Sequence, residues 1–105
     1  MKNAKEELHL MLAGKAVIKC ALISSENWRN DAEPEKVYKL PLNYTSEDLQ
    51  KFYASLDFDY DNGYGGQELF GTVWLEDGTW LSRGEYDGSE WWEHNKLPKI
   101  PDELL

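Results

Sequence analysis

The first stretch of the chain carries apolar residues at helical spacing. Asn3 followed three positions later by Glu6 is typical of an N-cap with its reciprocal partner. Gly14 is a favourable residue for ending a helix, because glycine adopts the left-handed conformation without strain. The apolar side of the stretch comprises Ala4, Leu8, Met11 and Leu12. This pattern predicts a helix over 4–13.

A second apolar stripe begins after Thr45. Thr45 is a favourable N-cap with Asp48 at the third helical position. Tyr44 is placed to pack on Leu49 as a hydrophobic staple. The stripe itself comprises Leu49, Phe52, Tyr53 and Leu56, and it predicts a second helix.

Between these helices the pattern changes to that of strands. Residues 16–24 alternate in hydrophobicity, with one side formed by Ala16, Ile18, Cys20 and Leu22. Residues 25–35 are polar and predict an exposed loop. A strand near 36–42 ends, or lies at a sheet edge, because Pro41 has no backbone N–H to donate.

The clearest local prediction is a hairpin over 68–86. Its two apolar runs flank Asp77-Gly78, a two-residue turn of the kind that favours positive φ. That turn sets Leu75 opposite Trp80 and Gly71 opposite Gly84, and the glycines leave a bare spot for a large ring or mark a bulge. In this register Trp80 faces the core with Leu69, Val73 and Leu75, whereas Arg83 lies on the other face with Phe70, Thr72 and Trp74.

The remaining segments complete a single-domain plan for residues 1–105. Residues 57–61 predict a short strand with its three aspartates on one face, and 90–94 a last strand after a turn at Asp87-Gly88. Residues 97–105, with two prolines, predict an extended strap with a terminal turn. Tight turns between sequential strands imply an α+β fold: an antiparallel sheet of about five strands with two helices packed on one face. We expect the exposed face to be acidic and partly aromatic.

All the excess negative charge lies in residues 57–93. This stretch holds ten acids and one base, against 20 and 11 in the whole chain, so the other ten acids and ten bases cancel and the net charge of −9 belongs to it. It also carries four of the five tryptophans. Carboxylates interleaved with aromatic rings indicate a binding surface for a basic partner, and argue against direct binding to nucleic acid or an anionic membrane.

Catalytic and metal-binding patterns are weak. Asp57, Asp59, Asp61 and Glu68 have the spacing of EF-hand positions 1, 3, 5 and 12, but Asn62 stands where that loop needs glycine. His94 with Glu90 and Glu93 is a second arrangement of metal-binding residue types. No nucleophile has a recognisable base, so we predict neither catalytic residues nor a cofactor.

Features of the whole chain bear on its location. The lone Cys20 excludes an internal disulfide and fits a reducing cytosol. The first ten residues lack the apolar region of a secretory signal, and no apolar run is long enough for a transmembrane helix. We therefore expect a cytoplasmic protein.

A resemblance adds biological context. At EYDGSEWWEH and LPKIPDEL, and back through GYGGQELFGTVWLEDGTW, the chain is similar to small uncharacterised accessory proteins of tailed bacteriophages. The resemblance implies an accessory protein acting in the cytoplasm of a bacterial host, and it brings no catalytic residue with it.

These observations give three functional hypotheses. The leading one is a non-enzymatic protein that binds a basic surface of a host protein, in the manner of a nucleic-acid-mimicking inhibitor. Its expected contact residues are Asp57, Asp59, Asp61, Trp74, Glu85, Asp87 and Trp92. The second hypothesis is a small calcium- or ligand-binding module that uses the acidic loop 57–68. The third is a homodimer with Trp74 and Trp92 in its interface.

Overall fold

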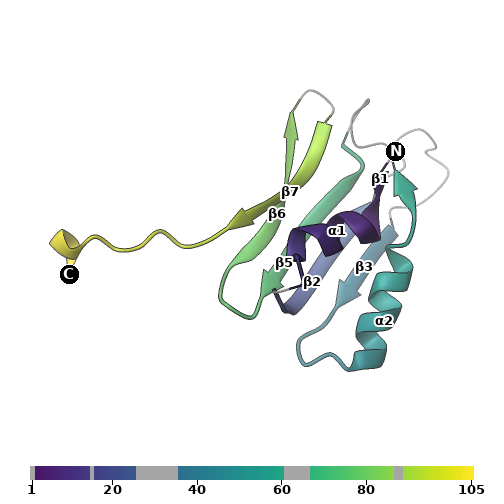
Figure 1. Cartoon of the computed structure of the whole chain (residues 1–105), viewed down its shortest axis with the longest axis horizontal. Helices are drawn as coiled ribbons and strands as arrows, with labels where there is room; N and C mark the ends of the chain where they lie inside the picture. Colours follow the sequence, from purple (N-terminus) through teal and green to yellow (C-terminus); the bar gives the residue numbers. More distant parts are fainter. Residues whose placement is uncertain (1, 15, 26–35, 61–66, 87–88) are drawn as a thin grey trace.

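The computed structural model describes residues 2–14, 16–25, 36–60, 67–86 and 89–105. Figure 1 shows a twisted sheet, helices beside it and a segment that projects from the body. In chain order the elements are β1 (Lys2–Asn3), α1 (Ala4–Leu12), β2 (Ile18–Ser25), β3 (Lys36–Leu40), α2 (Ser46–Ser55), β4 (Asp59–Tyr60), β5 (Leu69–Leu75), β6 (Trp80–Tyr86), β7 (Ser89–Asn95) and the 3₁₀ turn η1 (Asp102–Leu104).

Both helices begin at the caps that the sequence predicts. The Asn3 side chain accepts a hydrogen bond from the Glu6 backbone N–H at 3.0 Å. Thr45 and Asp48 form a reciprocal capping box, with bonds of 3.0 and 3.1 Å. Helix α1 ends slightly earlier than expected, because Ala13 takes the left-handed conformation and donates its N–H to His9. Local side-chain chemistry therefore sets the start of each helix.

The fold class is confirmed as α+β. Five strands form an antiparallel sheet in the order β3-β2-β5-β6-β7, and β1 pairs separately with β4. Helix α1 lies in front of the sheet, whereas α2 runs alongside the edge strand β3 (Figure 1). Packing of both helices on one face is therefore not confirmed. Among the described residues, no helix has the length and apolar character needed to span a lipid bilayer.

The core is a cluster of aliphatic side chains contributed by both helices, the strands and the segment after α2. Burying these side chains is the main favourable contribution to folding. The largest ones that are fully buried are Leu8, Ile23, Leu40, Leu56, Leu69, Val73 and Leu81. Phe52 of α2 and Tyr60 of β4 belong to the same cluster.

Strand β2 changes phase near its start, which the alternation pattern did not predict. The pairing with β5 shifts between Ile18 and Cys20. After this irregularity Ala21 and Ile23 are buried and Leu22 is exposed, whereas Ile18 is buried before it. The expected apolar side containing Ile18, Cys20 and Leu22 was therefore wrong, because an irregular pairing moves later residues to the opposite face.

The hairpin over β5 and β6 is confirmed, but its predicted register was wrong by one residue. Trp74 pairs with Trp80, and Val73 pairs with Leu81. The Asp77 carboxylate accepts hydrogen bonds from both the N–H and the hydroxyl of Thr79, which keeps Thr79 in the turn. A slip of one residue moves every side chain of a strand to the other face.

The corrected register reverses the roles predicted for β6. Leu81 is buried in the core, and the side chain of Arg83 is only 2% exposed. Trp80 lies with Trp74 on the opposite face and is only partly buried. Trp80 is therefore not the core residue that the sequence predicted, and Arg83 does not lie among Phe70, Thr72 and Trp74.

The remaining predictions of strands, turns and loops have different outcomes. The last strand is confirmed as β7, and residues 96–101 run without regular structure to η1. Within the described part of the expected strand, residues 57–60, Asp59–Tyr60 is a strand and pairs with β1, and Asp61 lies outside the described residues. The Asp87-Gly88 turn, the glycine-rich stretch 62–66 and the loop from 26 to 35 lie outside the described residues.

Candidate functional site

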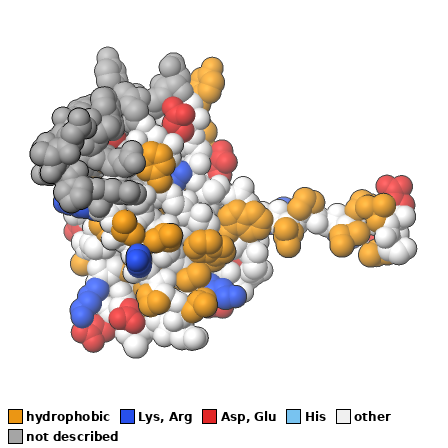
Figure 2. All heavy atoms as spheres, turned by 180° about the vertical axis from the view of Figure 1, so that it is seen from behind, with side chains coloured by type: hydrophobic (Ala, Val, Ile, Leu, Met, Phe, Trp, Pro, Cys, Tyr) orange, Lys and Arg blue, Asp and Glu red, His pale blue; other side chains and the backbone are white. Residues whose placement is uncertain are grey.

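The side of the sheet opposite α1 is a candidate binding surface. Strand pairing and burial place one set of side chains on it, which we call the outer face: Leu22, Val37, Lys39, Phe70, Thr72, Trp74, Trp80, Ser82, Trp91 and Glu93. Figure 2 shows hydrophobic side chains gathered on this side of the molecule, with acidic side chains toward its margins. The expectation of an acidic exposed face was therefore wrong for the described residues, since Glu93 is the one acid in this set.

Four apolar residues of the outer face are exposed although they belong to regular strands. The exposed fractions are 47% for Leu22, 48% for Val37, 41% for Trp74 and 38% for Trp91. Single exposed apolar residues are common on any surface, but a group of them on one sheet face is typical of an interaction surface. These four residues come from β2, β3, β5 and β7, so the group spans most of the sheet.

Trp91 is held in place by a glycine on the neighbouring strand. Gly84 pairs with Trp91, and a Cβ atom at Gly84 would lie 2.6 Å from the indole Nε1. The indole therefore occupies the space above the bare backbone of β6. Its N–H also donates to Glu93 at 3.1 Å. The predicted bare spot of Gly71 opposite Gly84 was therefore wrong, because the corrected register does not pair the two glycines. The space over Gly84 alone is filled by a ring from β7 rather than from α2, so this ring is already ordered before any partner binds.

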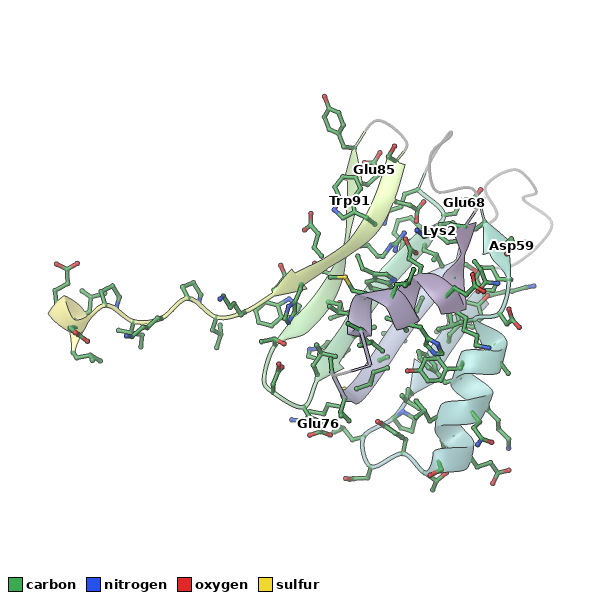
Figure 3. The ribbon with its side chains drawn as sticks, viewed as in Figure 1. Lys2, Asp59, Glu68, Glu76, Glu85 and Trp91 are labelled. Atoms are coloured by element: carbon green, nitrogen blue, oxygen red, sulfur yellow. The ribbon has the colours of Figure 1, made fainter. Side chains whose placement is uncertain are left out.

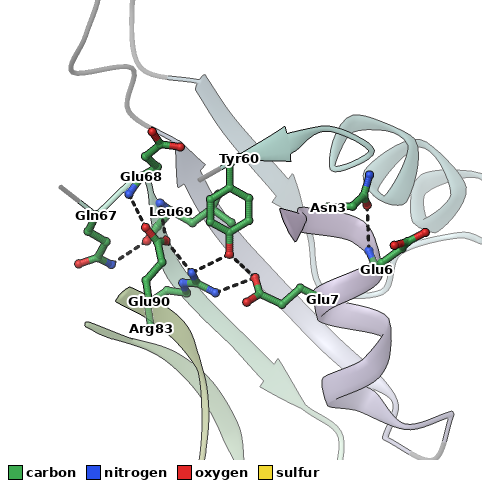
Figure 4. A network of polar contacts seen from close by, with 9 residues as sticks. All are labelled: Asn3, Glu6, Glu7, Tyr60, Gln67, Glu68, Leu69, Arg83 and Glu90. Carbon is green, nitrogen blue, oxygen red and sulfur yellow. Dashed lines mark hydrogen bonds and ion pairs between the residues drawn. The ribbon is translucent and has the colours of Figure 1, made fainter. Parts of the chain in front are cut away.

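Beneath the sheet, a buried ionic cluster joins four elements. Arg83 of β6 donates to Glu90 of β7 at 2.6 Å, to Glu7 of α1 at 3.1 Å and to the hydroxyl of Tyr60 of β4 at 3.0 Å (Figure 4). The Tyr60 hydroxyl also donates to Glu7. Glu90 accepts the backbone N–H groups of Glu68 and Leu69 at 2.7 and 2.9 Å, which fixes the start of β5.

The environment of this cluster changes the acidity of its members. Burial raises the pKa of Tyr60 well above its ordinary value, and the hydrogen bond to Glu7 adds to the increase. Burial opposes the charge of Arg83, but interactions with Tyr60 and Glu7 outweigh it and raise the pKa of the guanidinium. At neutral pH the cluster therefore holds a permanent cation, Arg83, and a neutral phenol, Tyr60, beside Glu7 and Glu90. Because these side chains are buried, the cluster connects the elements that contribute them.

Trp92 covers the same guanidinium. The ring centroid of Trp92 lies 4.8 Å from Arg83 Cζ, a cation–π arrangement. Trp92 is only 6% exposed, so the prediction that it is an exposed anchor was wrong. Neighbouring residues on a strand point to opposite faces, and it is Trp91 that points outward. Trp74 is exposed on the outer face, as the sequence predicted.

Of the acidic residues of the predicted surface, the structure brings Asp57 and Asp59 together at the side chain of Asn3. Asp57 and Asp59 are exposed, and both accept hydrogen bonds from the Asn3 side chain, at 3.0 and 3.3 Å. Glu85 is exposed on β6, and Figure 3 shows Asp59 and Glu85 in the upper part of the view and Glu76 at the opposite end. Asp61 and Asp87 lie outside the described residues.

The described residues do not form a metal centre. Across these residues, no group of three or more His, Cys, Asp or Glu side chains is placed to hold a metal ion. His94 instead bonds to Thr79 at 2.7 Å, while Glu90 is buried against Arg83. The proposed calcium loop includes Asp61, which lies outside the described residues, so calcium binding stays a prediction.

Of the four exposed apolar residues of the outer face, sequence reasoning identified Trp74 and missed Leu22, Val37 and Trp91. Leu22 was assigned to the buried side because the pairing irregularity after Ile18 is invisible in the alternation. The signal that was present for Trp91 is Gly84, since a glycine in a strand indicates close approach by a neighbouring group.

Comparison of the chain with protein-family models, with curated proteins and with solved structures finds no match in any of the three. The resemblance to phage accessory proteins therefore stays a prediction.

Proposed function

We propose that this protein is a non-enzymatic binding protein that recognises another protein through the outer face of its sheet. The observation that carries the proposal is the exposure of Leu22, Val37, Trp74 and Trp91, between 38% and 48%, on one side of the sheet. Aromatic side chains supply a large share of the free energy at protein interfaces. Because these side chains stand on a hydrogen-bonded sheet, little conformational entropy is lost when a partner binds.

The negative charge has a separate role in this proposal. A net charge of −9 attracts a basic partner over a distance set by the ionic strength, and so increases the rate of association. The partner we propose is a basic protein of a bacterial host, met in its cytoplasm. Figure 3 shows Glu76 at the opposite end of the molecule from Asp59 and Glu85, and Asp61 and Asp87 lie outside the described residues, so the described carboxylates do not by themselves support a continuous row of the kind a nucleic-acid mimic needs. Apolar contact on the outer face is therefore the better-supported mode of binding.

The test is an affinity capture from bacterial lysate with four baits. They are the wild-type protein, a double outer-face variant (Leu22→Ser with Val37→Ser), a control variant (Leu10→Ser) and an acid-neutralised variant (Asp57→Asn, Asp59→Asn and Glu85→Gln). Leu10 is a suitable control because it is 73% exposed on α1, away from the outer face. The three sites substituted in the outer-face and control variants, Leu22, Val37 and Leu10, are aliphatic and exposed, so we expect both variants to fold.

We expect one basic protein to be retained by the wild type and by the control, and to be lost with the outer-face variant. The acid-neutralised variant should still bind at equilibrium but associate more slowly, with a weaker dependence on salt. Retention by the outer-face variant together with loss from the acid-neutralised variant would instead make the carboxylates the contact surface. The same background on all four baits would contradict the proposal.

A further inference from the structure

The segment 96–105 projects from the body (Figure 1), and its large apolar side chains are exposed. Leu97, Ile100 and Leu104 are 76%, 58% and 73% exposed. Hydrophobic side chains continue along the whole segment in Figure 2. Burying them against another surface is favourable in proportion to the apolar area removed from water. The segment therefore has the composition of a ligand for an apolar surface.

The backbone of this segment is already in a binding-competent form. Pro98 and Pro101 are three residues apart, and Pro101 has φ −62° and ψ 146°, which are polyproline II values. Leu97 and Ile100 each precede a proline, which restricts them to extended conformations. A stiff polyproline segment loses little entropy on binding, and surfaces lined by aromatic rings recognise such segments.

The outer face offers a matching surface across its strands. Successive pairings align Lys39, Leu22, Thr72, Ser82 and Glu93 in one row, which we call the central row. On one side of it stand Trp74 and Trp80, which pair with each other, and on the other side stand Phe70 and Trp91. The middle of the central row thus has small hydroxyl side chains between two rows of aromatic ones.

We infer that the 96–105 segment of one copy of this protein lies across the central row of a second copy. This inference rests on the proposed function, because it uses the same outer face, and it adds a second occupant: in the absence of the basic host protein, the segment of another copy covers that face. Pro98, Ile100 and Pro101 would contact the aromatic rows, as proline-rich ligands contact aromatic rings. Reciprocal donation by two copies closes a twofold dimer.

Charge and length both fit this arrangement. The segment is basic at its start, with Lys96 and Lys99, and acidic later, with Asp102 and Glu103. The central row has Glu93 at one edge of the sheet and Lys39 at the other. Four strand spacings of about 4.8 Å separate these edges by roughly 19 Å. Six polyproline steps of about 3.1 Å place Asp102 roughly 19 Å from Lys96.

The same stiffness disfavours docking on the segment's own sheet. Asn95 still pairs with Trp80 at the end of β7, and the chain then runs outward from the body (Figure 1). Returning over the same sheet needs a sharp reversal within Lys96 and Leu97. Leu97 is held extended by Pro98, and such a reversal is therefore strained.

The test is sedimentation equilibrium of the full chain over a wide range of concentration. The wild type should show a monomer–dimer equilibrium. Ile100→Asp lies outside the folded body and should raise the dimer dissociation constant about tenfold or more, as should Leu22→Asp on the central row. Leu10→Asp, an exposed leucine on α1, should leave the constant unchanged. An equimolar mixture of Ile100→Asp and Leu22→Asp should regain dimers, because one contact of the pair is intact.

A second measurement uses a synthetic peptide of residues 96–105. Added to the Ile100→Asp variant, the peptide should change the tryptophan fluorescence in a saturable way, and it should have no effect on the fluorescence of Leu22→Asp.

Three results would each overturn the inference: a monomeric wild type, a dimer insensitive to Ile100→Asp, or cross-links from the segment to its own sheet. If the lysate protein is captured through Leu22 while the chain stays monomeric, the inference falls and the proposed function stands. A dimer insensitive to Leu22→Asp, with no capture through the outer face, overturns both.

Discussion

The guanidinium of Arg83 lies 2.6 Å from the carboxylate of Glu90, and neither side chain is more than 2% exposed. The two residues stand on adjacent strands, β6 and β7, and Glu90 in turn holds the start of β5 through two backbone N–H groups. This pair therefore fixes the half of the sheet that presents Trp74, Trp80 and Trp91. The outer face on one side of the sheet therefore depends on an ion pair buried under the other side.

Replacing Arg83 by methionine is expected to destabilise the protein strongly. The substitution leaves Glu90 and Glu7 buried without their cation, and breaking a buried pair in this way costs about 3–5 kcal/mol. Denaturant unfolding measures the loss. The control is Lys51→Met, which breaks a pair with Glu47 that is 75% exposed at both ends and should matter by less than about 0.5 kcal/mol. Equal losses of unfolding free energy for the two substitutions would show that the buried cluster does not stabilise the fold.

The stability should fall in alkali because of Tyr60. Burial and the bond to Glu7 raise the pKa of Tyr60 above the usual tyrosine value of about 10. The neutral phenol is thus favoured in the folded protein, and this stabilisation is complete below the unfolded-state pKa. Above it, unfolding releases a proton, so stability declines as pH rises toward the folded-state pKa. Denaturation curves across this range should decline less for Tyr60→Phe than for the wild type, and parallel declines would refute the assignment.

Two glycines should respond differently to alanine. At Gly71 the added Cβ would lie 2.2 Å from the Leu22 carbonyl oxygen, and φ is +137°, so the backbone itself must move. We expect a loss of about 3 kcal/mol. At Gly84 the obstacles are the side chains of Trp91 and Glu93, which can shift, and the loss should be about 1 kcal/mol. Thermal unfolding compares the two, and tryptophan emission should change mainly with Gly84→Ala. The reverse order of stability would contradict the described packing.

The adjacent tryptophans give a matched pair for the assignment of faces. Trp92→Ala removes a buried ring from above Arg83 and should cost about 3–5 kcal/mol. Trp91→Ala removes a partly exposed ring and should cost about 1 kcal/mol. Denaturant unfolding of both variants decides the matter, and a larger loss for Trp91→Ala would mean that the strand faces the other way.

Local features were predicted well from the sequence, whereas long-range features were predicted poorly. Both helix caps follow from residues three positions apart, and they were predicted correctly. The hairpin register was missed because it depends on how Asp77 binds Thr79, which the Asp-Gly pair alone does not reveal. The burial of Arg83 follows from that register and from Glu7, 76 positions away in the chain. The irregularity in β2 similarly concealed Leu22, the central apolar residue of the outer face.

The most direct test of the central claim is site-specific photo-cross-linking in the bacterial cytoplasm. A photoreactive residue is placed at Leu22 on the outer face, and in a second preparation at Leu10 on α1, which is also exposed. Proteins binding through the outer face should give a discrete adduct from position 22, whether the partner is another protein or a second copy, and none from position 10. Adducts of equal yield from both positions, or none from position 22, would contradict the account.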